Sequence, residues 1–512
     1  MTRLETLCRN PSGREFFAYV GRLGFLLVLR RFSIFDSKNR LRHRAPAFGR
    51  RPLFFSSNIF VYLALPSLIR IFAAHGYLFN FSENMENRKF GQGTLCVQAG
   101  WTPRKGESRI VPIIQSTTFK YDTSQQMARL FDLEDSGYFY TRLQNPTTDA
   151  VAAKIAALEG GVGAMLTSSG QAANFYAVLN ICSAGDHIVS ATDIYGGTFN
   201  LFGVTLKKMG IEVTFIDPDG SEEEIAAAFR PETKALFGET VSNPGVAVLD
   251  IEKFARIAHG HGVPLIVDNT FATPINCRPI EWGADIVTHS TTKYMDGHAT
   301  SVGGAIVDSG NFDWAAHGDR FPGLTTPDAS YHGLTYTESF GRSAYIVKAT
   351  AQLMRDLGCS PSPQNAFLLN IGLETLHLRM PRHCANAQRV AEYLSSRTDK
   401  VSWVHYCGLQ GDKYYELGRK YLPEGSCGVL AFGLKGGREV AIRFMDSLRL
   451  AAIVTHVADA RTSVLHPASH THRQLTDEQL REAGVAPDLI RFSVGIEDPD
   501  DIIADIEQAL AV

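Results

Sequence analysis

Lys293 stands at the end of a polar run that contains Ser290 and Thr292. The apolar pair Ile286 and Val287 before this run is typical of a buried strand, so the lysine lies just past the strand's carboxyl end. In open α/β sheets, ligands bind in the crevice outside those strand ends. A lysine there can form a Schiff base with an aldehyde cofactor, while the hydroxyls hold a phosphate. The segment also fits an ordinary exposed loop lysine, and taken alone it favours that simpler interpretation.

Asp268 ends a second apolar run, 264–267, and is the strongest companion of the lysine. A carboxylate buried without a partner is costly, so such a site should supply a cation or a protonated nitrogen. A protonated pyridine ring is one such partner. The alternative is a structural aspartate that caps a helix.

Two further strand ends carry residues suited to a flat, phosphorylated cofactor. Ser169, Gly170 and Gln171 lie where a strand meets a helix, and small residues there expose backbone N–H groups to an anion. Tyr195 follows another strand and can stack on a ring. A turn kept small for steric reasons and a tyrosine that anchors a turn explain the same residues.

Three more side chains can bind anions. Tyr140 and Arg142 are two positions apart, so an extended chain places a phenol and a guanidinium on one side, as fork-like phosphate binding requires. Arg491 follows the apolar pair 489–490 and can hold a substrate carboxylate, although most arginines near strand ends are merely solvated.

Composition limits the class of protein. The chain has 512 residues, 45% of them apolar, which is enough for two or three domains with full cores. A net charge of -3 gives neither the basic field of a nucleic-acid-binding protein nor the acidic excess of a disordered one. The eight cysteines include no C-x-x-C pair or zinc-like grouping, so we expect reduced thiols and a cytoplasmic location.

The first 84 residues differ from the rest. They are rich in arginine, and their apolar segment, 53–69, is interrupted by polar residues and proline. A transit peptide or membrane anchor is one interpretation, but the segment is short for a span, which needs about 20 apolar residues. Because ordinary globular composition begins at Met85, we favour a wrongly assigned start, with residues 1–84 disordered and without function.

From residue 85 onward the pattern predicts an N-terminal arm, 85–147, and two domains. Residues 148–361 alternate between short β-rich runs and helices, which predicts an α/β fold with a mostly parallel central sheet and helices on both faces. Expected strands are 164–167, 187–190, 212–216, 234–237, 264–267 and 285–288. Residues 362–512 contain longer helices, 365–378 and 383–394, and a few strands, which predicts a smaller C-terminal α+β domain.

The order of these motifs resembles the Cys/Met-metabolism family of pyridoxal-phosphate (PLP) enzymes. Within it, Ser169-Gly170-Gln171, the run Asp459-Ala460-Arg461-Thr462 and an insert at 312–337 are most similar to the O-acetylhomoserine sulfhydrylase branch (O-acetylhomoserine aminocarboxypropyltransferases). The matching motifs are Tyr140-x-Arg142, Ser169-Gly170-Gln171, Tyr195-Gly196-Gly197, Asn243-Pro244, Asp268-Asn269-Thr270, 290–294, 459–462, 466–469 and 491–495.

The resemblance implies the PLP-dependent transferase fold of type I and a role for each residue. Lys293 would form the Schiff base with pyridoxal 5'-phosphate, Asp268 would bind its ring nitrogen, and Tyr195 would stack on the ring. The phosphate would be held by backbone N–H groups of Gly170 and Gln171, the hydroxyls of Ser290 and Thr292, and Tyr140 and Arg142 of a neighbouring subunit. Arg491 and Asn243 would hold the substrate carboxylate.

The implied reaction is γ-replacement on O-acetyl-L-homoserine by sulfide or methanethiol, which gives homocysteine or methionine plus acetate. Methionine γ-lyase and cystathionine γ-synthase chemistry are the alternatives within the family. A non-catalytic scaffold with the same fold would lack residues at the key positions, and all of those residues are present. The expected partners are these small molecules. We expect no nucleic acid to bind, and no membrane to bind the part of the chain that resembles the family. The resemblance further implies at least a dimer with shared sites, and usually a tetramer.

The chain departs from the family pattern at 455–459. His456 occupies a place where many relatives carry Ser or Asn, and Ala458 stands where glycine is usual. The sequence favours a structural histidine over one that alters substrate handling, and we place His456 and Val457 at the substrate site. The histidines at 466, 470 and 472 fall in a family motif that makes them structural, so no metal is predicted.

Overall fold

The computed structural model describes residues 89–470 and 486–511. The expectations for residues 1–84 and for His472 therefore lie outside the described residues. None of the helices in the described part of the chain is long and apolar enough to cross a membrane. Seven described cysteines are free thiols, and all of them are buried except Cys359.

The N-terminal arm contains two short helices, α4 (Gln92–Gln98) and α5 (Ser124–Phe131). Residues 110–115 form no strand. They are held instead to the start of the next helix, because the Thr147 hydroxyl accepts a hydrogen bond from Ile114 N at 2.9 Å and donates one to Pro112 O at 2.6 Å. The arm is therefore tied to the large domain by side chains rather than by a sheet.

Helix α6 (Pro146–Glu159) has a local stop or start signal at each end. The Asn145 side chain caps its first turn by accepting from Thr147 N, with proline in the first turn. Gly160 ends the helix at φ +83°, a conformation that favours glycine.

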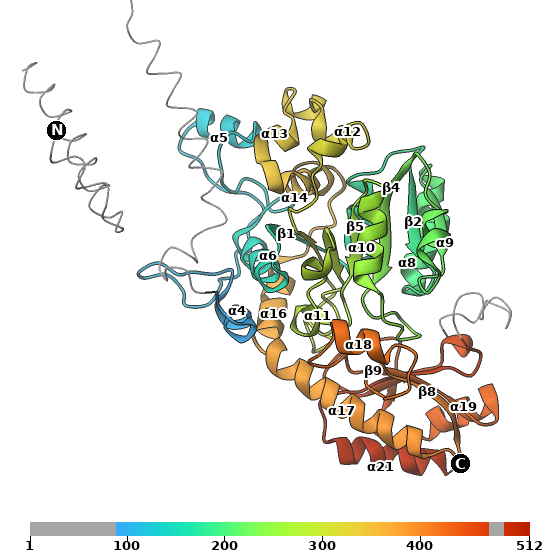
Figure 1. Ribbon diagram of the computed structural model, residues 1–512. Helices are drawn as coiled ribbons and strands as arrows, with labels where there is room; N and C mark the ends of the chain where they lie inside the picture. The colour runs from blue at the N-terminus through green and yellow to red at the C-terminus, as the bar shows by residue number, and fades with distance from the viewer. Residues whose placement is uncertain (1–88, 471–485, 512) are drawn as a thin grey trace, which may run out of the picture. The chain divides into compact units, whose positions relative to one another are not determined.

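A seven-stranded sheet forms the centre of the large domain (Figure 1). All neighbouring strands are parallel except β7, which is antiparallel to both β1 and β6. The six predicted strands are confirmed; β7 was not predicted, and it completes the sheet between β1 and β6. In spatial order the strands are β1 (Gly163–Thr167), β7 (Gly304–Asp308), β6 (Ile286–His289), β5 (Leu265–Asp268), β4 (Thr233–Glu239), β2 (His187–Ala191) and β3 (Glu212–Ile216).

Helices cover both faces of this sheet. Right-handed crossovers place connections that run in opposite directions along the strand order on opposite faces. Helix α7 and the π-helix η1 therefore share one face, while α9 and α10 share the other, and Figure 1 shows α10 lying along β4 and β5. The segments are α7 (Gly170–Leu179), α8 (Gly196–Asn200), η1 (Leu201–Leu206), α9 (Glu222–Ala226), α10 (Ile251–Gly260), α11 (Thr273–Asn276) and η2 (Pro279–Trp282).

Short helices follow β7 and pack beside the arm (Figure 1). They are η3 (Ala315–His317), α12 (Pro322–Thr325), η4 (Ala329–Tyr331), α13 (Tyr336–Phe340), η5 (Gly341–Ser343), α14 (Ala344–Lys348), η6 (Ala349–Met354) and α15 (Arg355–Leu357).

The C-terminal part contains a separate five-stranded sheet in the order β10-β11-β12-β9-β8. Only β10 and β11 are parallel. The expected helices are present, but the second is one continuous helix through Pro381 rather than a helix starting at 383. The elements are α16 (Pro363–Glu374), α17 (Leu376–Ser396), β8 (Val401–His405), α18 (Tyr415–Tyr421), β9 (Val429–Leu434), α19 (Gly437–Ser447), β10 (Ala452–Ile453), β11 (Ser463–Leu465), η7 (Pro467–Ser469), β12 (Ile490–Ser493) and α21 (Pro499–Leu510).

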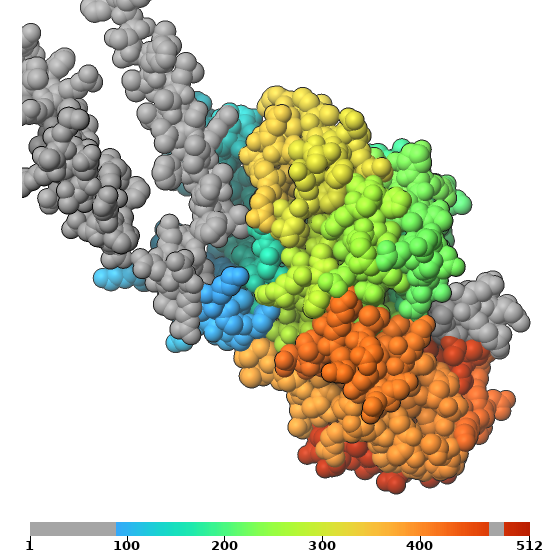
Figure 2. Space-filling model, in the orientation of Figure 1, coloured from blue at the N-terminus to red at the C-terminus, as the bar shows by residue number. Residues whose placement is uncertain are grey.

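The two sheets lie in parts of the chain that are in direct contact. Figure 2 shows the orange surface around α18 against the green surface of the large domain. Tyr421 at the end of α18 donates a hydrogen bond to Asp250 and accepts one from Glu252 N at 3.1 Å, at the start of α10. We propose 85–147, 148–361 and 362–512 as the arm and the two domains, since each sheet falls within one of them.

Candidate active site

The carboxyl ends of β4, β5 and β6 bring three of the relevant side chains to one edge of the sheet. Glu239 and Asp268 end β4 and β5 and are paired in register. Lys293 lies in the turn after β6, where its backbone N–H donates to Ser290 O at 3.2 Å. Parallel strands align their carboxyl ends, so the sequence motifs meet here because of the fold.

Lys293 is mostly buried, and burial lowers the pKa of its ammonium group to about 8. The positive charge of Arg491 acts in the same direction, whereas Asp459 partly offsets both. A lysine with a pKa near 8 has a far larger neutral fraction at neutral pH than an exposed one, and the neutral amine is the form that attacks a carbonyl.

Asp268 is 8% exposed and is held by neutral donors. It accepts hydrogen bonds from Asn174 Nδ2 at 3.1 Å, from Thr270 N at 3.0 Å and from the Thr270 hydroxyl. None of these donors is a cation. A buried carboxylate in this state fits the protonated nitrogen of a ring, because such a group would supply the missing positive charge.

Asn174, on α7, is a site residue that sequence reasoning missed. Its side chain donates to Asp268 and to the Thr198 hydroxyl at 3.2 Å, and it accepts from the Thr288 hydroxyl at 2.6 Å. Thr198 in turn donates to Gln171 Oε1 at 3.1 Å. The signal in the sequence was weak: Asn174 is, after Gln171, the second side-chain amide of a mostly apolar helix.

The start of α7 lies directly against Ser290. A Cβ atom on Gly170 would come within 2.5 Å of Ser290 Cβ, so only glycine permits this approach. The Ser169 hydroxyl accepts from Ala172 N, which leaves the amides of Gly170 and Gln171 as first-turn donors without intrahelical partners. Together with the Ser290 hydroxyl, they form a place for an anion.

The Thr292 hydroxyl, which the sequence predicts to bind the phosphate, already forms two hydrogen bonds within the protein. Its hydroxyl donates to Gly303 O at 3.1 Å and accepts from Gly303 N at 3.0 Å. These bonds hold the lysine-bearing turn against the start of β7.

Tyr195 is 47% exposed, and its ring lies close to Gly197, where a Cβ atom would meet the ring at 2.5 Å. Its backbone N–H donates to Glu239 Oε1 at 2.7 Å. Burial, followed by the charge of Asp268, raises the pKa of Glu239 well above its usual value. Glu239 thus positions Tyr195, a role that the sequence did not suggest.

Arg491, on β12, is buried and reaches across to the large domain. It donates to Asn243 Oδ1 at 3.2 Å and to Thr455 O at 3.3 Å, while its Nε atom has no hydrogen-bond partner. No carboxylate among the described residues forms an ion pair with it. Burial lowers the pKa of its guanidinium to about 10, because a charged group loses hydration in the interior. An anionic ligand would offset this free energy of desolvation.

His456 lies beside the lysine. Its Nδ1 atom is 3.5 Å from Lys293 Nζ, and its Nε2 atom is 3.4 Å from Asp459 Oδ2. Val457, by contrast, is 2% exposed and packs in the hydrophobic core. Ala458 has φ +66°, where glycine is favoured, and this turn directs His456 toward the lysine.

Tyr140 and Arg142 lie together but apart from the other candidates. The Arg142 guanidinium is 4.9 Å from the centre of the Tyr140 ring, and its Nε donates to Arg355 O at 2.9 Å. In the described part of the chain, neither makes a hydrogen bond or ion pair with Lys293 or Asp268. Both side chains are exposed, as a contribution to a neighbouring subunit would require.

Two other features do not belong to this site. Within residues 89–470 and 486–511, no group of three or more His, Cys, Asp or Glu residues is arranged to hold a metal, and His466 bonds to Ser469 and Pro487.

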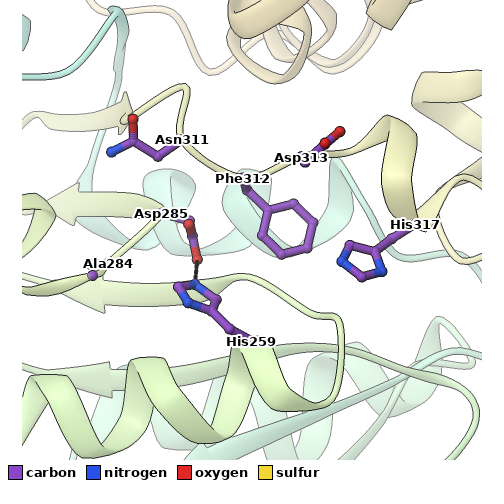
Figure 3. Close-up of a pocket in the computed structure, with 8 residues that line it drawn as sticks. His259, Ala284, Asp285, Asn311, Phe312, Asp313 and His317 are labelled. Atoms are coloured by element: carbon purple, nitrogen blue, oxygen red, sulfur yellow. Dashed lines mark hydrogen bonds and ion pairs between the residues drawn. The ribbon is translucent and has the colours of Figure 1, made fainter.

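A cavity of about 230 Å³ is lined by His259, Asp285 and Phe312, among others (Figure 3). Asp285 precedes β6, so this cavity lies at the opposite end of the strand from Lys293.

The arrangement fits pyridoxal phosphate. That molecule presents a phosphate, a ring nitrogen and an aldehyde. The start of α7 with Ser290 matches the phosphate, and the partly buried amine of Lys293 matches the aldehyde. The carboxylate of Asp268, which has no cationic partner among the described residues, matches the ring nitrogen.

Comparison with known proteins identifies the family. The family model described as Cys/Met metabolism PLP-dependent enzyme matches residues 93–511. The chain is 47% identical over 421 residues to the homocysteine synthase of Schizosaccharomyces pombe, covering 82% of this chain and 98% of the relative. It is 44% identical over 433 residues to the O-acetyl-L-homoserine sulfhydrylase of Leptospira meyeri, covering 83% and 97%.

A solved structure is also similar. The crystal structure of a protein named as an O-acetylhomoserine (thiol)-lyase from Campylobacter jejuni matches with a TM-score of 0.80 and 38% identity, covering 83% of this chain and all of the other. That structure contains N'-pyridoxyl-lysine-5'-monophosphate.

Proposed function

Because this chain belongs to the Cys/Met metabolism family of PLP-dependent enzymes, we propose that it catalyses γ-replacement on O-acetyl-L-homoserine. Sulfide is the acceptor that the names of the relatives favour, and the products are L-homocysteine and acetate. Methanethiol, which would give methionine, is the second acceptor to test.

The observation that carries this proposal is the lysine and its surroundings. Lys293 is a partly buried amine with a pKa of about 8, near the buried Arg491. It stands at the same sheet edge as Asp268, which forms no ion pair among the described residues. These three groups supply a nucleophile, a partner for a protonated ring and a binding group for a carboxylate.

Bound pyridoxal phosphate would supply an electron sink for the carbon acid chemistry. Lys293 would hold the cofactor and then act as the base at the substrate Cα. Asp268 would keep the ring nitrogen protonated, and Tyr195 would cover the ring. Gly170, Gln171, Ser290 and Thr292 would hold the phosphate, and the Thr292 hydroxyl would turn its proton from Gly303 O toward the phosphate to do so.

Arg491 and Asn243 would bind the substrate carboxylate. The guanidinium has a free Nε donor and lacks an anionic partner among the described residues, while Asn243 already orients one of its other nitrogens. His456 would complete this side of the site, whereas Val457, whose side chain packs in the core, would border it only through its backbone. The binding energy of the carboxylate would thus fix the substrate with its Cα near Lys293.

The direct test is a steady-state assay of the purified protein with O-acetyl-, O-succinyl- and O-phospho-L-homoserine against sulfide, methanethiol and cysteine. We expect homocysteine from the acetyl ester and sulfide. Keto-acid and ammonia release from methionine would instead indicate a γ-lyase, and preferential use of cysteine a cystathionine γ-synthase. Either result would contradict the proposal.

We also propose that the active unit is at least a dimer with shared sites, in which Tyr140 and Arg142 serve the neighbouring subunit. Their exposure and separation from Lys293 support this. Mixing inactive Lys293→Ala and Arg142→Ala proteins should restore part of the activity, because one site of the mixed dimer then has both residues. Mixed dimers that form but stay inactive would contradict shared sites.

A cytoplasmic location is proposed as well, supported by the seven described cysteines, which are all free thiols. Fractionation of cells that express the full chain, probed with an antibody, tests it. Recovery of the protein in an organelle or membrane fraction would contradict it.

A further inference from the structure

Arg379, on α17, is a buried arginine that binds the turn carrying Lys293, residues 291–297, which we call the lysine turn. The residue is 6% exposed. Its Nη1 atom donates to Tyr294 O at 2.7 Å and its Nη2 atom to Met295 O at 3.4 Å, so it contacts the two residues that follow the lysine. Nη2 also donates to Gly372 O at 2.6 Å, on α16. One guanidinium therefore joins two helices of the C-terminal part to the backbone beside Lys293.

The acceptors of Arg379 among the described residues are neutral oxygens, since its Nε atom donates to the Thr375 hydroxyl at 3.1 Å and no described carboxylate forms an ion pair with it. Burial lowers the pKa of its guanidinium to about 10, and the nearby charge of Asp296 opposes this effect. A buried cation without a counterion is costly, so an apolar side chain would serve packing alone better. A guanidinium adds several donors in a fixed plane, and here they bind consecutive carbonyl groups of the lysine turn.

Two glycines make room for this contact. Gly297, at φ +70°, lies against the guanidinium, and a Cβ atom there would overlap it. A Cβ atom on Gly372 would overlap the carbonyl oxygens of Met295 and Asp296. Both the lysine turn and the helix that packs on it are thus shaped for close approach around Arg379.

The lysine turn has two further attachments to the C-terminal part. The backbone N–H of Gly428 donates to the Tyr294 hydroxyl at 2.8 Å, and that of Ala460 donates to Gly297 O at 2.9 Å. Gly297 N in turn donates to Lys293 O at 2.7 Å. The backbone that carries the lysine is therefore held by the C-terminal part as well as by β6.

The same C-terminal part carries Arg491, to which we assign the substrate carboxylate. Arg491 lies on β12, and its charge is one of those that act on Lys293. A base must lie within hydrogen-bonding reach of the proton that it removes. The distance from the lysine amine to a substrate held by Arg491 thus depends on how the lysine turn sits on the C-terminal part.

We propose that Arg379 is a positioning residue for Lys293, which fixes the lysine amine relative to a substrate bound at Arg491 by binding the carbonyl groups of Tyr294 and Met295. In the described part of the chain, Arg379 makes no hydrogen bond or ion pair with the side chain of Lys293 or Arg491, so it acts through the backbone of the lysine turn. This inference rests on the proposed function and gives a role to a residue outside the site itself.

The first measurement needs no turnover. Arg379→Met keeps an unbranched side chain but removes every donor, so the lysine turn can move and water can reach Lys293. Burial is the largest cause of the lowered pKa of Lys293, ahead of the charges of Arg491 and Asp459, which the substitution leaves in place. When cofactor-free protein gains visible absorbance with pyridoxal phosphate, the pH midpoint of the rate should therefore move up by about one unit.

The second measurement is steady-state turnover of O-acetyl-L-homoserine with sulfide. A misplaced lysine slows the proton transfer, whereas the groups that bind the substrate carboxylate are unchanged. We expect kcat of Arg379→Met to fall by about 10²-fold, the loss typical of a reacting group displaced by about 1 Å. The KM for the ester should change by less than about threefold, because ground-state binding is retained.

Two further variants separate positioning from charge and from general stability. Arg379→Lys keeps the positive charge, but a single ammonium group cannot reproduce the planar fork, so it should show smaller changes in the same directions. It also carries the test if Arg379→Met fails to fold. Arg397→Met is the matched control on the same helix, since the Arg397 side chain contacts Tyr393 and Asp399, and it should leave both readouts unchanged.

A folded Arg379→Met protein with the midpoint and kcat of the parent would overturn the role of Arg379. A raised KM at unchanged kcat, parent values in Arg379→Lys, or the same changes in Arg397→Met would overturn it as well. The proposed function can fail separately. If the parent forms no homocysteine from this ester, the γ-replacement is refuted, and the midpoint of cofactor loading still decides whether Arg379 positions Lys293.

Discussion

The side-chain amide of Asn174 lies 3.1 Å from the carboxylate of Asp268, although 94 residues separate them in the chain. This contact joins the first helix after β1 to the end of β5. It orients the carboxylate that we assign to the ring nitrogen of the cofactor, and it continues through Thr198 to Gln171 beside the phosphate site.

Asn174→Leu tests this orientation. The substitution keeps the approximate volume but removes the donor, and a hydrogen bond to a charged group contributes roughly 1.5–3 kcal/mol. We expect weaker cofactor binding and a loss of free energy of unfolding of that order, measured by denaturant titration of the cofactor-loaded protein. Thr198→Val, which removes only the next link, should have a smaller effect. Unchanged cofactor affinity in Asn174→Leu would refute the role of this contact.

Lys293→Ala removes the amine that we assign to the aldehyde of the cofactor. Turnover and the visible absorbance of the bound cofactor should both disappear, while the free energy of unfolding stays close to that of the parent. Lys348→Ala is a useful comparison, because Lys348 is also buried with a pKa of about 8 but donates to Asn180 O, away from the site. Activity retained in Lys293→Ala would rule out the assignment.

The pKa of Lys293 predicts how cofactor loading depends on pH. Only the neutral amine reacts, so the rate at which cofactor-free protein gains visible absorbance should rise about tenfold per pH unit below the pKa of about 8 and level off above it. Arg491 lowers this pKa, so Arg491→Met should move the midpoint to higher pH. Arg491→Lys keeps the charge and should move it less. A midpoint in Arg491→Met at or below that of the parent would contradict this account.

Gly170→Ala should disturb the phosphate site through a steric clash. The added Cβ would meet the Cα and Cβ atoms of Ser290 at 2.8 and 2.5 Å, so the start of α7 must shift away. We expect the affinity for pyridoxal phosphate to fall by about tenfold, equivalent to roughly 1.4 kcal/mol. Gly260→Ala is the matched control, since a Cβ there meets nothing within 4 Å. Equal affinities in the two variants would argue against the close approach.

Local signals in the sequence predicted much of the large domain. The β-rich runs that end at Asp268 and before Lys293 depend on residues a few positions apart, and the structure has them as expected. The cap at Asn145 and the stop at Gly160 are equally local. Strand β7 escaped prediction because its membership in the sheet depends on pairing with β1 and β6 rather than on its own pattern.

The sequence by itself determined the residues to which we assign the chemistry, since the lysine, the aspartate and the small-residue turn each stand at the end of a recognisable strand. Only the tertiary structure decided how they are paired. It placed His456 against Lys293 across 163 residues, left the buried Arg491 without an ion-pair partner among the described residues, and bound the Thr292 hydroxyl to Gly303. Strand ends and caps are encoded locally by periodicity and backbone preference. The contacts of Lys293 and Arg491 depend instead on the packing of the two domains, and the contact of Thr292 depends on the pairing of β6 with β7.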